Sequence, residues 1–489
     1  MGGLARKAQY TAVARREAGI AGRGVLLLDG GDMLFPDEPL SADEIPQRQL
    51  KAELILDASE KMGVDASAVG DQDLKLGVEY LQNLATAKKF PFLCANLVRV
   101  ADGKPVFPAH VVKTVAGGTR IGLFAILTPT DSDGKPVVPP PTYRIDDPTE
   151  TAKREIAALR AEGAQIVIAL SHLGLNADHA LARDVSGIDF IVGAHSQSLV
   201  ADPVHEGSTW ILQAGFRAKE LGRLELDFKA PLPGALAKLV DVSAVTRVRE
   251  RVKTYDERID ELKSRLATET DTDRKVMLQD QIDFYTEQKG IEAKNLPVED
   301  ATASALRNQL VDLNREIVDE PQVESMVRAT LEKMSKLPPS ALGPEPDKDG
   351  ILPGPTSGPY VGVKVCQGCH VPEYQAWAAT DHARAYRSLV TDARQLDFDC
   401  VGCHTTGYRT DGGPKDPFSV GGMAAVQCEA CHGPGRAHSA DPKNVKANVA
   451  FDEKFCRACH SIEQTGDRFV FADYLPRVQH KKDPGAPKK

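Results

Sequence analysis

Cys366-Gln-Gly-Cys369-His370 is the first of four copies of a five-residue pattern near the end of the chain. In each copy two cysteines stand three positions apart and a histidine follows directly. Two thiols at this spacing can each form a thioether with one haem vinyl group, and the histidine can bind the iron from the same face. The pattern is therefore typical of c-type haem attachment. The other copies are Cys400-Val-Gly-Cys403-His404, Cys428-Glu-Ala-Cys431-His432 and Cys456-Arg-Ala-Cys459-His460.

A pair of zinc ribbons is the alternative, because zinc sites also use Cys-x-x-Cys knuckles. Zinc knuckles do not require a histidine directly after the second cysteine, whereas all four copies have one. The pattern therefore favours haem over zinc. We expect four covalently bound haem c groups and a protein that transfers electrons.

The composition limits the other classes of function. With 489 residues the chain is long enough for about three domains. Its 42% hydrophobic and 26% charged residues are typical of a globular protein. The formal net charge is −9, and haem propionates would add to it, so nucleic acid is a poor partner.

Cysteine usage indicates the compartment. Eight of the nine cysteines belong to the four motifs, and Cys94 is left over, so no disulfide framework is expected. Haem is attached to such motifs outside the cytoplasm, which predicts an exported, periplasmic or extracellular protein. Residues 1–30 lack the basic-then-apolar pattern of a signal peptide, and no stretch is long enough to span a bilayer. We expect that a signal was removed or lies upstream of Met1.

Residues 1–240 alternate short apolar runs with helix-like stretches such as 74–88 and 148–162. This rhythm indicates an α/β domain. The runs predicted to be buried strands are Val25–Asp29, Phe90–Asn96, Ile121–Ile126, Ile166–Leu170, Phe190–Val192 and Trp210–Gln213.

Residues 241–336 change character. Apolar residues from Val248 to Leu266 follow a 4-3-4-3-4 spacing, the stretch 268–274 is polar, and the 4-3 spacing resumes at Leu278. An antiparallel helical hairpin is the expected structure, and one long coiled coil is the alternative. Such a hairpin could also join copies of the chain into an oligomer. A third helix is predicted from the spacing of Leu306, Leu310, Leu313 and Ile317.

Residues 337–361 are rich in proline and glycine and are predicted to be a linker. Residues 362–489 then form the expected haem domain, mostly helical or irregular. Seven of the twelve histidines lie in it, of which four belong to the motifs. Because buried haem irons take a second axial ligand, the other three are candidate distal ligands. They are His382, His438 and His480.

The end of the chain resembles the tetrahaem cytochrome c554 family over about 125 residues. The resemblance lies in Asp381-His-Ala-Arg-Ala385 after the first motif, in Cys400-Val-Gly-Cys-His-Thr-Thr-Gly-Tyr408, and in Val426-Gln-Cys-Glu-Ala-Cys-His-Gly-Pro-Gly435. Members of that family pass electrons between redox proteins. The resemblance implies that His438 is distal to the first haem, His382 to the third and His480 to the fourth. The second haem, on His404, would then be five-coordinate.

Residues 1–240 resemble the metallophosphatase domain of periplasmic 5′-nucleotidases and of the related thiosulfohydrolases. The matching residues are Gly2-Gly-Leu-Ala-Arg6, Leu26-Leu-Leu-Asp-Gly-Gly-Asp32, Gly70-Asp-Gln-Asp73, Phe92-Leu-Cys-Ala-Asn96, Ser171-His172, Gly193-Ala-His-Ser-Gln197 and Gln213-Ala214. The resemblance implies a sandwich of two β-sheets flanked by helices. The family's first strand, with its Asp-x-His, would lie before Met1.

The resemblance also implies a metal site that differs from the family pattern. The family binds two metal ions, whereas here Asp71 stands at a ligand asparagine, Gln72 at the catalytic histidine and Lys75 at the aspartate that orients it. Two carboxylates and two imidazoles remain for one divalent ion, Zn, Mn or Fe. Whether they bind metal or are leftover polar residues stays open. The implied ligands are Asp32, Asp71, His172 and His195, with Gln197 left at the second position.

Two functions follow from these patterns. The first is an exported multihaem cytochrome that passes electrons between other redox proteins or cytochromes, with a front domain that has lost hydrolysis. The alternative is a redox-coupled, metal-dependent hydrolase that acts on an ester of a phosphorus or sulfur oxyanion.

Overall fold

The computed structural model describes residues 3–131, 134–138, 141–232, 234–294, 303–337, 354–447, 452–465 and 468–480. The chain divides into two compact units. The sheet unit comprises Gly2–Pro36 and Leu56–Glu320, and the motif unit comprises Asp37–Ile55 and Pro321–Lys489. The boundaries differ from the expected domains, because residues 37–55 group with the Cys-x-x-Cys-His motifs and residues 241–320 group with the front of the chain.

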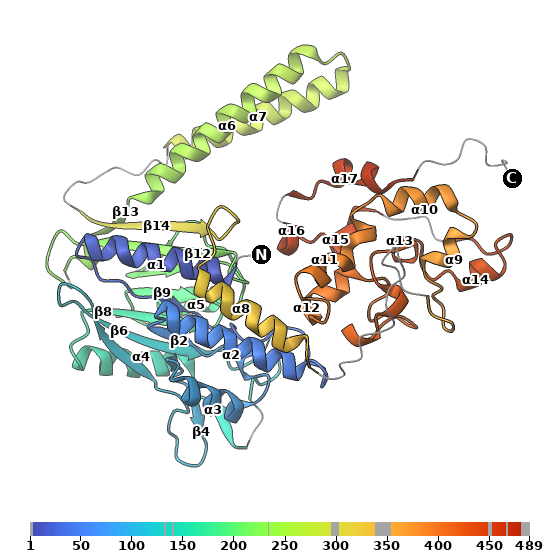
Figure 1. Cartoon of the computed structure of the whole chain (residues 1–489). Coiled ribbons are helices and arrows are strands. Elements are labelled where there is room, and N and C mark those ends of the chain that lie inside the picture. The colour runs from blue at the N-terminus through green and yellow to red at the C-terminus, as the bar shows by residue number, and fades with distance from the viewer. Residues whose placement is uncertain are drawn as a thin grey trace. The chain divides into compact units, whose positions relative to one another are not determined.

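A six-stranded sheet forms the middle of the sheet unit (Figure 1). Strands β6, β8, β9 and β11 run parallel, and β5 and β10 are antiparallel strands at the two edges. All seven residues of β8 are buried, as expected for a parallel strand covered on both faces. Several predicted strands are thereby confirmed. The bounds are β5 His110–Thr114, β6 Arg120–Leu127, β8 Ile166–His172, β9 Phe190–Gly193, β10 Val204–Glu206 and β11 Thr209–Leu212.

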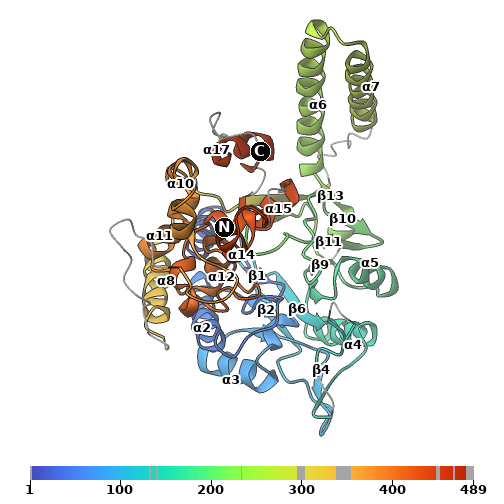
Figure 2. The ribbon, with the colours of Figure 1, turned by 90° about the vertical axis from the view of Figure 1, so that its right-hand side faces the viewer.

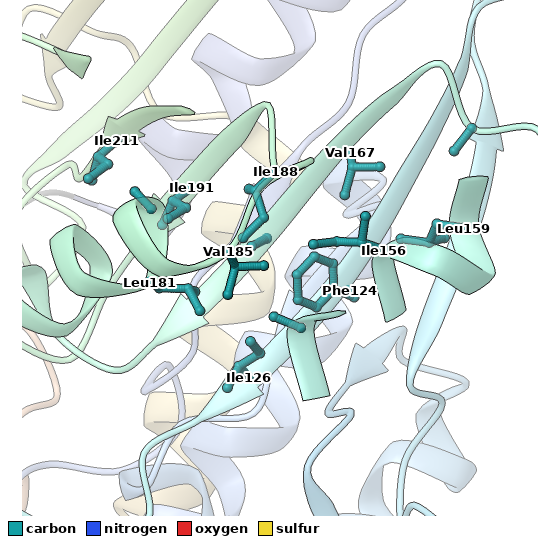
Figure 3. Packing of buried hydrophobic residues seen from close by; sticks show 14 residues of the cluster. Phe124, Ile126, Ile156, Leu159, Val167, Leu181, Val185, Ile188, Ile191 and Ile211 are labelled. Atoms are coloured by element: carbon teal, nitrogen blue, oxygen red, sulfur yellow. The ribbon is translucent and has the colours of Figure 1, made fainter. Parts of the chain in front are cut away.

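Helices cover one face of this sheet. Phe124 and Ile191 from the strands pack against Ile156 of α4 (Pro148–Ala161) and Leu181 of α5 (Leu175–Asp184), as Figure 3 shows. The start of α4 is fixed locally, because the Asp147 carboxylate accepts a hydrogen bond from the Glu150 N–H and Pro148 follows it. The helix predicted at 148–162 is therefore confirmed.

Two small sheets cover the opposite face and give the expected two-layer arrangement. Leu123 and Ile168 of the central sheet pack against Ala66 in one small sheet and Leu306 in the other. The first has the order β1-β2-β3 and the second β12-β14-β13. The remaining bounds of this unit are α1 Leu4–Ile20, β1 Leu28–Asp29, β2 Ala66–Ala68, η1 Gln72–Leu74, α3 Val78–Lys88, β3 Phe92–Leu93, β4 Leu97–Arg99, β7 Tyr143–Ile145, β12 Glu220–Asp227, η2 Leu236–Lys238, β13 Leu239–Asp241 and β14 Ser304–Asp312.

The third helix predicted from Leu306, Leu310, Leu313 and Ile317 is wrong. Strand β14 occupies this stretch and pairs antiparallel with β12 and parallel with β13. A spacing of four residues, as between Leu306 and Leu310, fits the period of a strand as well as that of a helix. The alternation of buried Leu306 and Asn308 with exposed Arg307 and Gln309 is the strand signal.

The predicted helical hairpin is confirmed as α6 (Ser243–Thr268) and α7 (Thr272–Lys294). Ile259 and Leu262 of α6 pack against Leu278 and Ile282 of α7. The hairpin leaves the sheet unit between β13 and β14 and projects from it (Figure 2).

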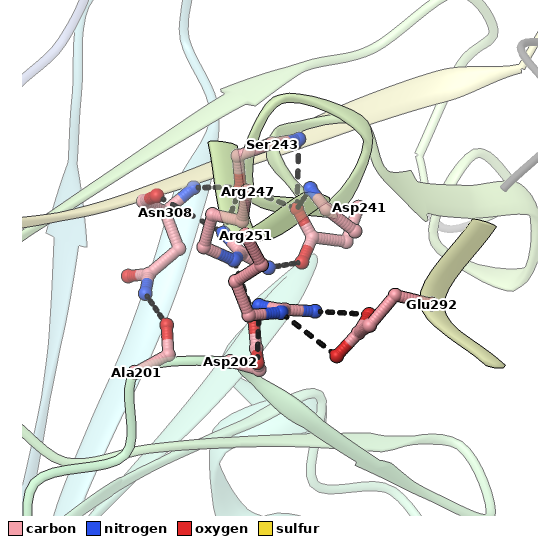
Figure 4. Close-up of polar contacts among 9 residues, drawn as sticks. Ala201, Asp202, Asp241, Ser243, Arg247, Arg251, Glu292 and Asn308 are labelled. Carbon is pink, nitrogen blue, oxygen red and sulfur yellow. Dashed lines mark hydrogen bonds and ion pairs between the residues drawn. The ribbon is translucent and has the colours of Figure 1, made fainter. Parts of the chain in front are cut away.

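Ion pairs anchor the base of the hairpin to the sheet unit (Figure 4). Arg247 of α6 pairs with Asp241 of β13 at 2.5 Å and also with Asp202. Arg251 joins the two helices through Glu292 at 3.0 Å. The base of the hairpin is therefore fixed to the sheet unit by these ion pairs.

The motif unit consists of short helices and turns, as expected. Residues 338–353 of the expected linker lie outside the described residues. Its helices are the first half of α2 (Ile45–Met62), α8 Pro321–Met334, α9 Val363–Gln367, α10 Val371–Ala378, η3 His382–Arg384, α11 Ala385–Thr391, α12 Phe398–Val401, η4 Gly402–His404, η5 Pro417–Ser419, η6 Gly421–Met423, α13 Cys428–His432, α14 Arg436–Ala440, α15 Glu453–Arg457, α16 Ile462–Thr465 and α17 Phe471–Val478.

Candidate haem and metal sites

Each Cys-x-x-Cys-His motif lies on a helical turn. In the first and fourth motifs the histidine N–H donates to the carbonyl of the first cysteine at 2.9 Å, from His370 to Cys366 and from His460 to Cys456. Residues three apart on such a turn lie on the same face, so the two thiols of a motif point the same way. The turn therefore places the two thiols of a motif on one side, as haem attachment requires.

The motifs are also close to one another in pairs. The Cys366 thiol contacts that of Cys428, and the Cys403 thiol contacts that of Cys459. The buried Glu429 carboxylate accepts hydrogen bonds from the Val361 N–H at 3.0 Å and the Gly362 N–H at 2.7 Å. It thereby holds the peptide before the first motif against the third.

Three pairs of imidazole rings face each other in the motif unit, and each pairs a motif histidine with one of the three spare histidines. The ring centroids are 6.1 Å apart for His370 and His438, 6.0 Å for His460 and His382, and 5.8 Å for His432 and His480. A metal–imidazole bond is about 2 Å long, so two imidazoles on opposite sides of one metal ion have centroids roughly 6 Å apart. The three pairs therefore fit axial ligation of a haem iron.

The pairing differs from the expectation for two of the spare histidines. The ring of His438 lies opposite that of the first motif, whereas the ring of His382 lies opposite that of the fourth motif and the ring of His480 opposite that of the third. Which haem each of them ligates stays a prediction. The backbone of His382 does lie beside the third motif, since its carbonyl accepts from the Val426 N–H at 3.2 Å. Its ring lies 6.0 Å from that of His460, and a position in the chain does not determine which ring it meets.

His404 of the second motif faces none of the three spare histidines among the described residues, because each of them pairs with another motif. Its Nδ1 lies 2.6 Å from the Ala385 carbonyl, to which the ring donates. This bond leaves Nε2 as the nitrogen available to a metal, as is usual for histidine ligands.

The protonation of one facing pair, the spare histidine His382 and the motif histidine His460, also suits metal ligation. Burial, with His460 nearby, lowers the pKa of the His382 ring, and burial with Arg457 nearby lowers that of His460. Both rings are therefore neutral at ordinary pH, and only a neutral imidazole can bind a metal.

A second cluster lies in the sheet unit, where Asp32, Asp71, His172 and His195 bring one ligand atom each within 4.8 Å of one another. Asp32 and Asp71 follow β1 and β2, His172 ends β8, and His195 follows β9. All four therefore lie at the carboxyl ends of parallel strands, which is where open α/β sheets bind ligands.

Asp71 is the centre of this cluster. Its Oδ1 is 3.0 Å from His172 Nε2 and 3.0 Å from His195 Nδ1, and His172 Nε2 is 3.1 Å from Asp32 Oδ2. The His172 Nδ1 donates to the Gly30 carbonyl at 2.7 Å, so a neutral ring would turn a bare Nε2 toward two carboxylates. Only an extra proton or a metal ion makes that contact favourable.

The electrostatics of the cluster are consistent with this description. Burial opposes charge on His172, but Asp32 and Asp71 outweigh it and raise the pKa of the ring to about 10. Burial likewise opposes charge on Asp71, and the two histidines outweigh it and lower the pKa of that carboxyl. Without a metal, the cluster is therefore a charged network, and two carboxylates with two imidazoles are a suitable donor set for Zn, Mn or Fe.

The backbone at this site is strained. Asp32, His195 and Gln197 have φ values of 59°, 66° and 56°, in the left-handed region that residues other than glycine rarely adopt. Such strain persists where the surrounding structure enforces it, commonly at functional sites. Gly70 is required, because a Cβ there would lie 2.1 Å from Asp32 Oδ1.

Gln197 is the implied ligand that is not shown to join the cluster. It is exposed, and no hydrogen bond among the described residues ties it to the four ligands. Gln72, which the resemblance places at the family's catalytic histidine, donates from Nε2 to Asp71 Oδ2 at 2.8 Å. An amide in this place cannot act as a general acid.

Sequence reasoning gave no role to Asp73, which is fully buried. Its carboxylate accepts hydrogen bonds from the backbone N–H groups of Asp32 at 2.9 Å, Leu34 at 3.0 Å and Gly70 at 3.0 Å. It thereby ties the loop that carries Asp32 to the turn that carries Asp71. An aspartate two residues after a ligand in Gly70-Asp-Gln-Asp73 was the available signal.

Two parts of the chain have known relatives. Residues 365–433, which hold the first three motifs, match the family model described as cytochrome c554 and c-prime. The chain is 29% identical over 288 residues to a 5′-nucleotidase of Vibrio cholerae, covering 50% of each protein. It is 27% identical over 224 residues to a 2′,3′-cyclic-nucleotide 2′-phosphodiesterase/3′-nucleotidase of Salmonella typhimurium, covering 40% of this chain and 33% of the relative.

Solved structures with similarity include the sulfate thiohydrolase SoxB of Thermus thermophilus, at a TM-score of 0.47 and 20% identity, covering 68% of this chain and 47% of the other. The chain spans a third to a half of the length of the curated relatives named above. The chain therefore combines a region that matches a cytochrome c family with a front part that has nucleotidase relatives.

Proposed function

We propose that this protein is a multihaem c-type cytochrome that transfers electrons, with four covalent haems in residues 362–489. The single observation that carries the proposal is the set of three facing imidazole pairs, each joining a Cys-x-x-Cys-His motif to a spare histidine. Independent surface histidines would have no reason to face motif histidines at about 6 Å. The match to the cytochrome c554 and c-prime model supports the same function.

The residues have distinct roles in this proposal. Cys366 and Cys369, Cys400 and Cys403, Cys428 and Cys431, and Cys456 and Cys459 form the thioethers. A haem iron held this way supplies one-electron exchange between its ferric and ferrous states. His370 with His438, His432 with His480 and His460 with His382 would each supply two ligands to one of three irons. His404 would hold the fourth iron alone, so that iron would have a position open to a small ligand.

The thiol contacts indicate how the electron route is arranged. Because Cys366 touches Cys428 and Cys403 touches Cys459, the first haem would lie beside the third and the second beside the fourth. Other redox proteins or cytochromes would be the donor and acceptor. Since haem is attached to such motifs outside the cytoplasm, we place the protein in the periplasm or outside the cell. No helix among the described residues is long and apolar enough to cross a membrane.

We propose further that the sheet unit binds one divalent metal ion and does not hydrolyse nucleotides. Asp32, Asp71, His172 and His195 would hold the ion, which acts as a Lewis acid when bound. Elemental analysis should find one Zn, Mn or Fe beyond the haem irons, and His195→Ala should lose it. The same content in both proteins would reject this site.

The open position on His404 is tested by electron paramagnetic resonance of the oxidised protein. We expect a high-spin signal from about one haem in four, and we expect nitric oxide to change it, because an open axial position binds small ligands. An entirely low-spin spectrum that nitric oxide leaves unchanged would reject the open position. It would leave the four attachment sites untouched.

A redox-coupled hydrolase is the second candidate, favoured by the intact four-residue cluster and by the nucleotidase relatives. Against it stands Gln72, which donates to Asp71 where the family has its catalytic histidine. Turnover of AMP with added manganese or zinc, lost in His195→Ala, would favour the hydrolase. The absence of turnover in a protein that demonstrably holds metal would favour the electron carrier.

A further inference from the structure

One face of helix α2 packs on the second motif within the motif unit. Gln47, Arg48 and Lys51 lie on α2, and Glu44 directly precedes it. Glu44 is three and four residues from Gln47 and Arg48, and Lys51 is four and three residues from them, so the four side chains lie along one side. We call these four residues the α2 face. Each of them contacts a residue between Leu396 and Arg409, the stretch that carries Cys400, Cys403 and His404.

Two cations of the α2 face bind the two carboxylates that precede Cys400. Lys51 Nζ lies 2.6 Å from Asp397 Oδ1 and 2.5 Å from Asp399 Oδ2. Arg48 Nη1 lies 2.8 Å from Asp399 Oδ1. Gln47 donates from Nε2 to the Leu396 carbonyl at 2.6 Å.

The far end of the motif stretch is held by the same face. Glu44 forms an ion pair with Arg409, which lies five residues after His404. The second carboxylate oxygen of Glu44 lies 3.3 Å from Arg48. The Glu44 and Arg48 side chains are only 4% and 9% exposed. Removing one partner of a buried ion pair leaves an uncompensated charge, so these contacts fix the geometry strongly.

These contacts also involve helix α12, which carries Cys400. Asp397 caps α12, because its Oδ1 accepts from the Asp399 N–H at 3.1 Å while its carbonyl accepts from the Cys400 N–H at 3.0 Å. A side chain that holds Asp397 therefore holds the turn on which Cys400 stands.

The charges in this contact are unbalanced. Burial would raise the pKa of Asp399, but Lys51 and Arg48 outweigh it and lower the pKa, so the carboxylate stays charged. The network holds one more cation than carboxylate. Its cations are Arg48, Lys51, Arg394 and Arg409, and its carboxylates are Glu44, Asp397 and Asp399.

We propose that the α2 face is a positioning element for the second haem, and that Lys51 and Arg48 set its reduction potential through Asp397 and Asp399. The proposal rests on the proposed function, namely a haem on Cys400, Cys403 and His404. Reduction adds one electron to the ferric iron and lowers its positive charge, so a nearby cation favours the ferrous state. A segment that precedes the motif by about 350 residues would thus tune the haem on His404.

The test is a redox titration of the full holoprotein, with the four haems resolved as components and the high-spin signal followed in parallel. In Lys51→Gln, one component, the high-spin one, should move to a lower potential while the other three stay in place. Asp399→Asn should move the same component to a higher potential, because it removes a negative charge. Lys51→Arg should restore the original value.

Lys443→Gln is the matched control, because it also removes one cation from the motif unit, at an exposed position. It should not shift the high-spin component that Lys51→Gln shifts. Intact mass separates this inference from the proposed function. Wild type with fewer than four haems contradicts the proposed function. Four haems with the second potential unmoved in both Lys51→Gln and Asp399→Asn overturn the inference alone. Loss of only the haem on Cys400 and Cys403 in either variant supports the positioning role.

Discussion

The two units of this protein are built on different principles. In the sheet unit, β8 is buried at all seven positions, and Phe124 and Leu170 are completely buried in an apolar core. In the motif unit, polar groups such as Glu429 and Gln427 are buried and bond to the backbone, and pairs of imidazoles face each other across about 6 Å. The core of the sheet unit is therefore built largely from apolar side chains, whereas the motif unit also relies on buried polar side chains that bond to the backbone. We propose that bound haems complete its core.

The strongest test of this contrast removes one attachment site. In the double variant Cys428→Ala, Cys431→Ala, the motif unit should lose its resistance to limited proteolysis, because the third motif contacts both the first motif and the peptide before it. The sheet unit should remain resistant. Cys94→Ala, a buried cysteine of the sheet unit, is the control and should leave the haem content unchanged. Equal loss in both units would mean that they do not fold independently.

The second test damages the other unit. Phe124→Ala should lower the free energy of unfolding of the sheet unit by about 3–5 kcal/mol, because it leaves a cavity beneath α4. The haem absorption spectrum should not change. Val276→Ala, at a position 56% exposed on α7, should cost less than about 0.5 kcal/mol. A change in the haem spectrum of Phe124→Ala would break the comparison.

The third test sharpens the description of the motif unit. His438→Ala should convert one low-spin haem to high spin, so that about two haems in four rather than one give the high-spin resonance signal. His179→Ala in the sheet unit should leave that signal unaltered. If His438→Ala also leaves it unaltered, then the facing rings are not axial ligands.

The smallest expected effect is a pH dependence in the sheet unit. Burial opposes charge on His110, but Glu155 at 2.5 Å and Glu162 at 3.2 Å outweigh it and raise its pKa. Stabilisation from this pair is therefore complete below the ordinary histidine pKa of about 6.5 and is lost as the pH rises through the raised value. Denaturant unfolding between pH 6 and 9 should show this loss in the wild type and not in His110→Gln. The same pH dependence in both proteins would assign the effect to another group.

Much of the sheet unit could be predicted because its signals are local. The apolar runs at 121–126 and 166–170 are long enough to be strands and appear as β6 and β8. The spacing of Leu306 and Leu310 fits two periods equally, and only pairing with β12 and β13 decides for a strand. The cluster of Asp32, Asp71, His172 and His195 was predictable from the family resemblance, whereas the role of Asp73 depends on backbone N–H groups that no sequence pattern displays.

The motif unit was predictable in its chemistry and less so in its geometry. Five residues specify each haem attachment site, and a count of histidines specifies how many distal ligands are available. Which motif histidine each spare histidine meets depends on how turns cross in space. The expectation paired His382 with the third motif and His480 with the fourth, whereas their rings lie opposite those of the fourth and third motifs. The contact of Lys51 with Asp397 joins residues far apart in the chain, and no local sequence pattern predicts it.

The attachment of four haems is tested most directly by the intact mass of the purified holoprotein, followed by mass mapping of its peptides. We predict a mass that exceeds that of the polypeptide by four haems, with one haem on each of the peptides that contain Cys366, Cys400, Cys428 and Cys456. Three or fewer haems, or stoichiometric zinc with no haem, would contradict it.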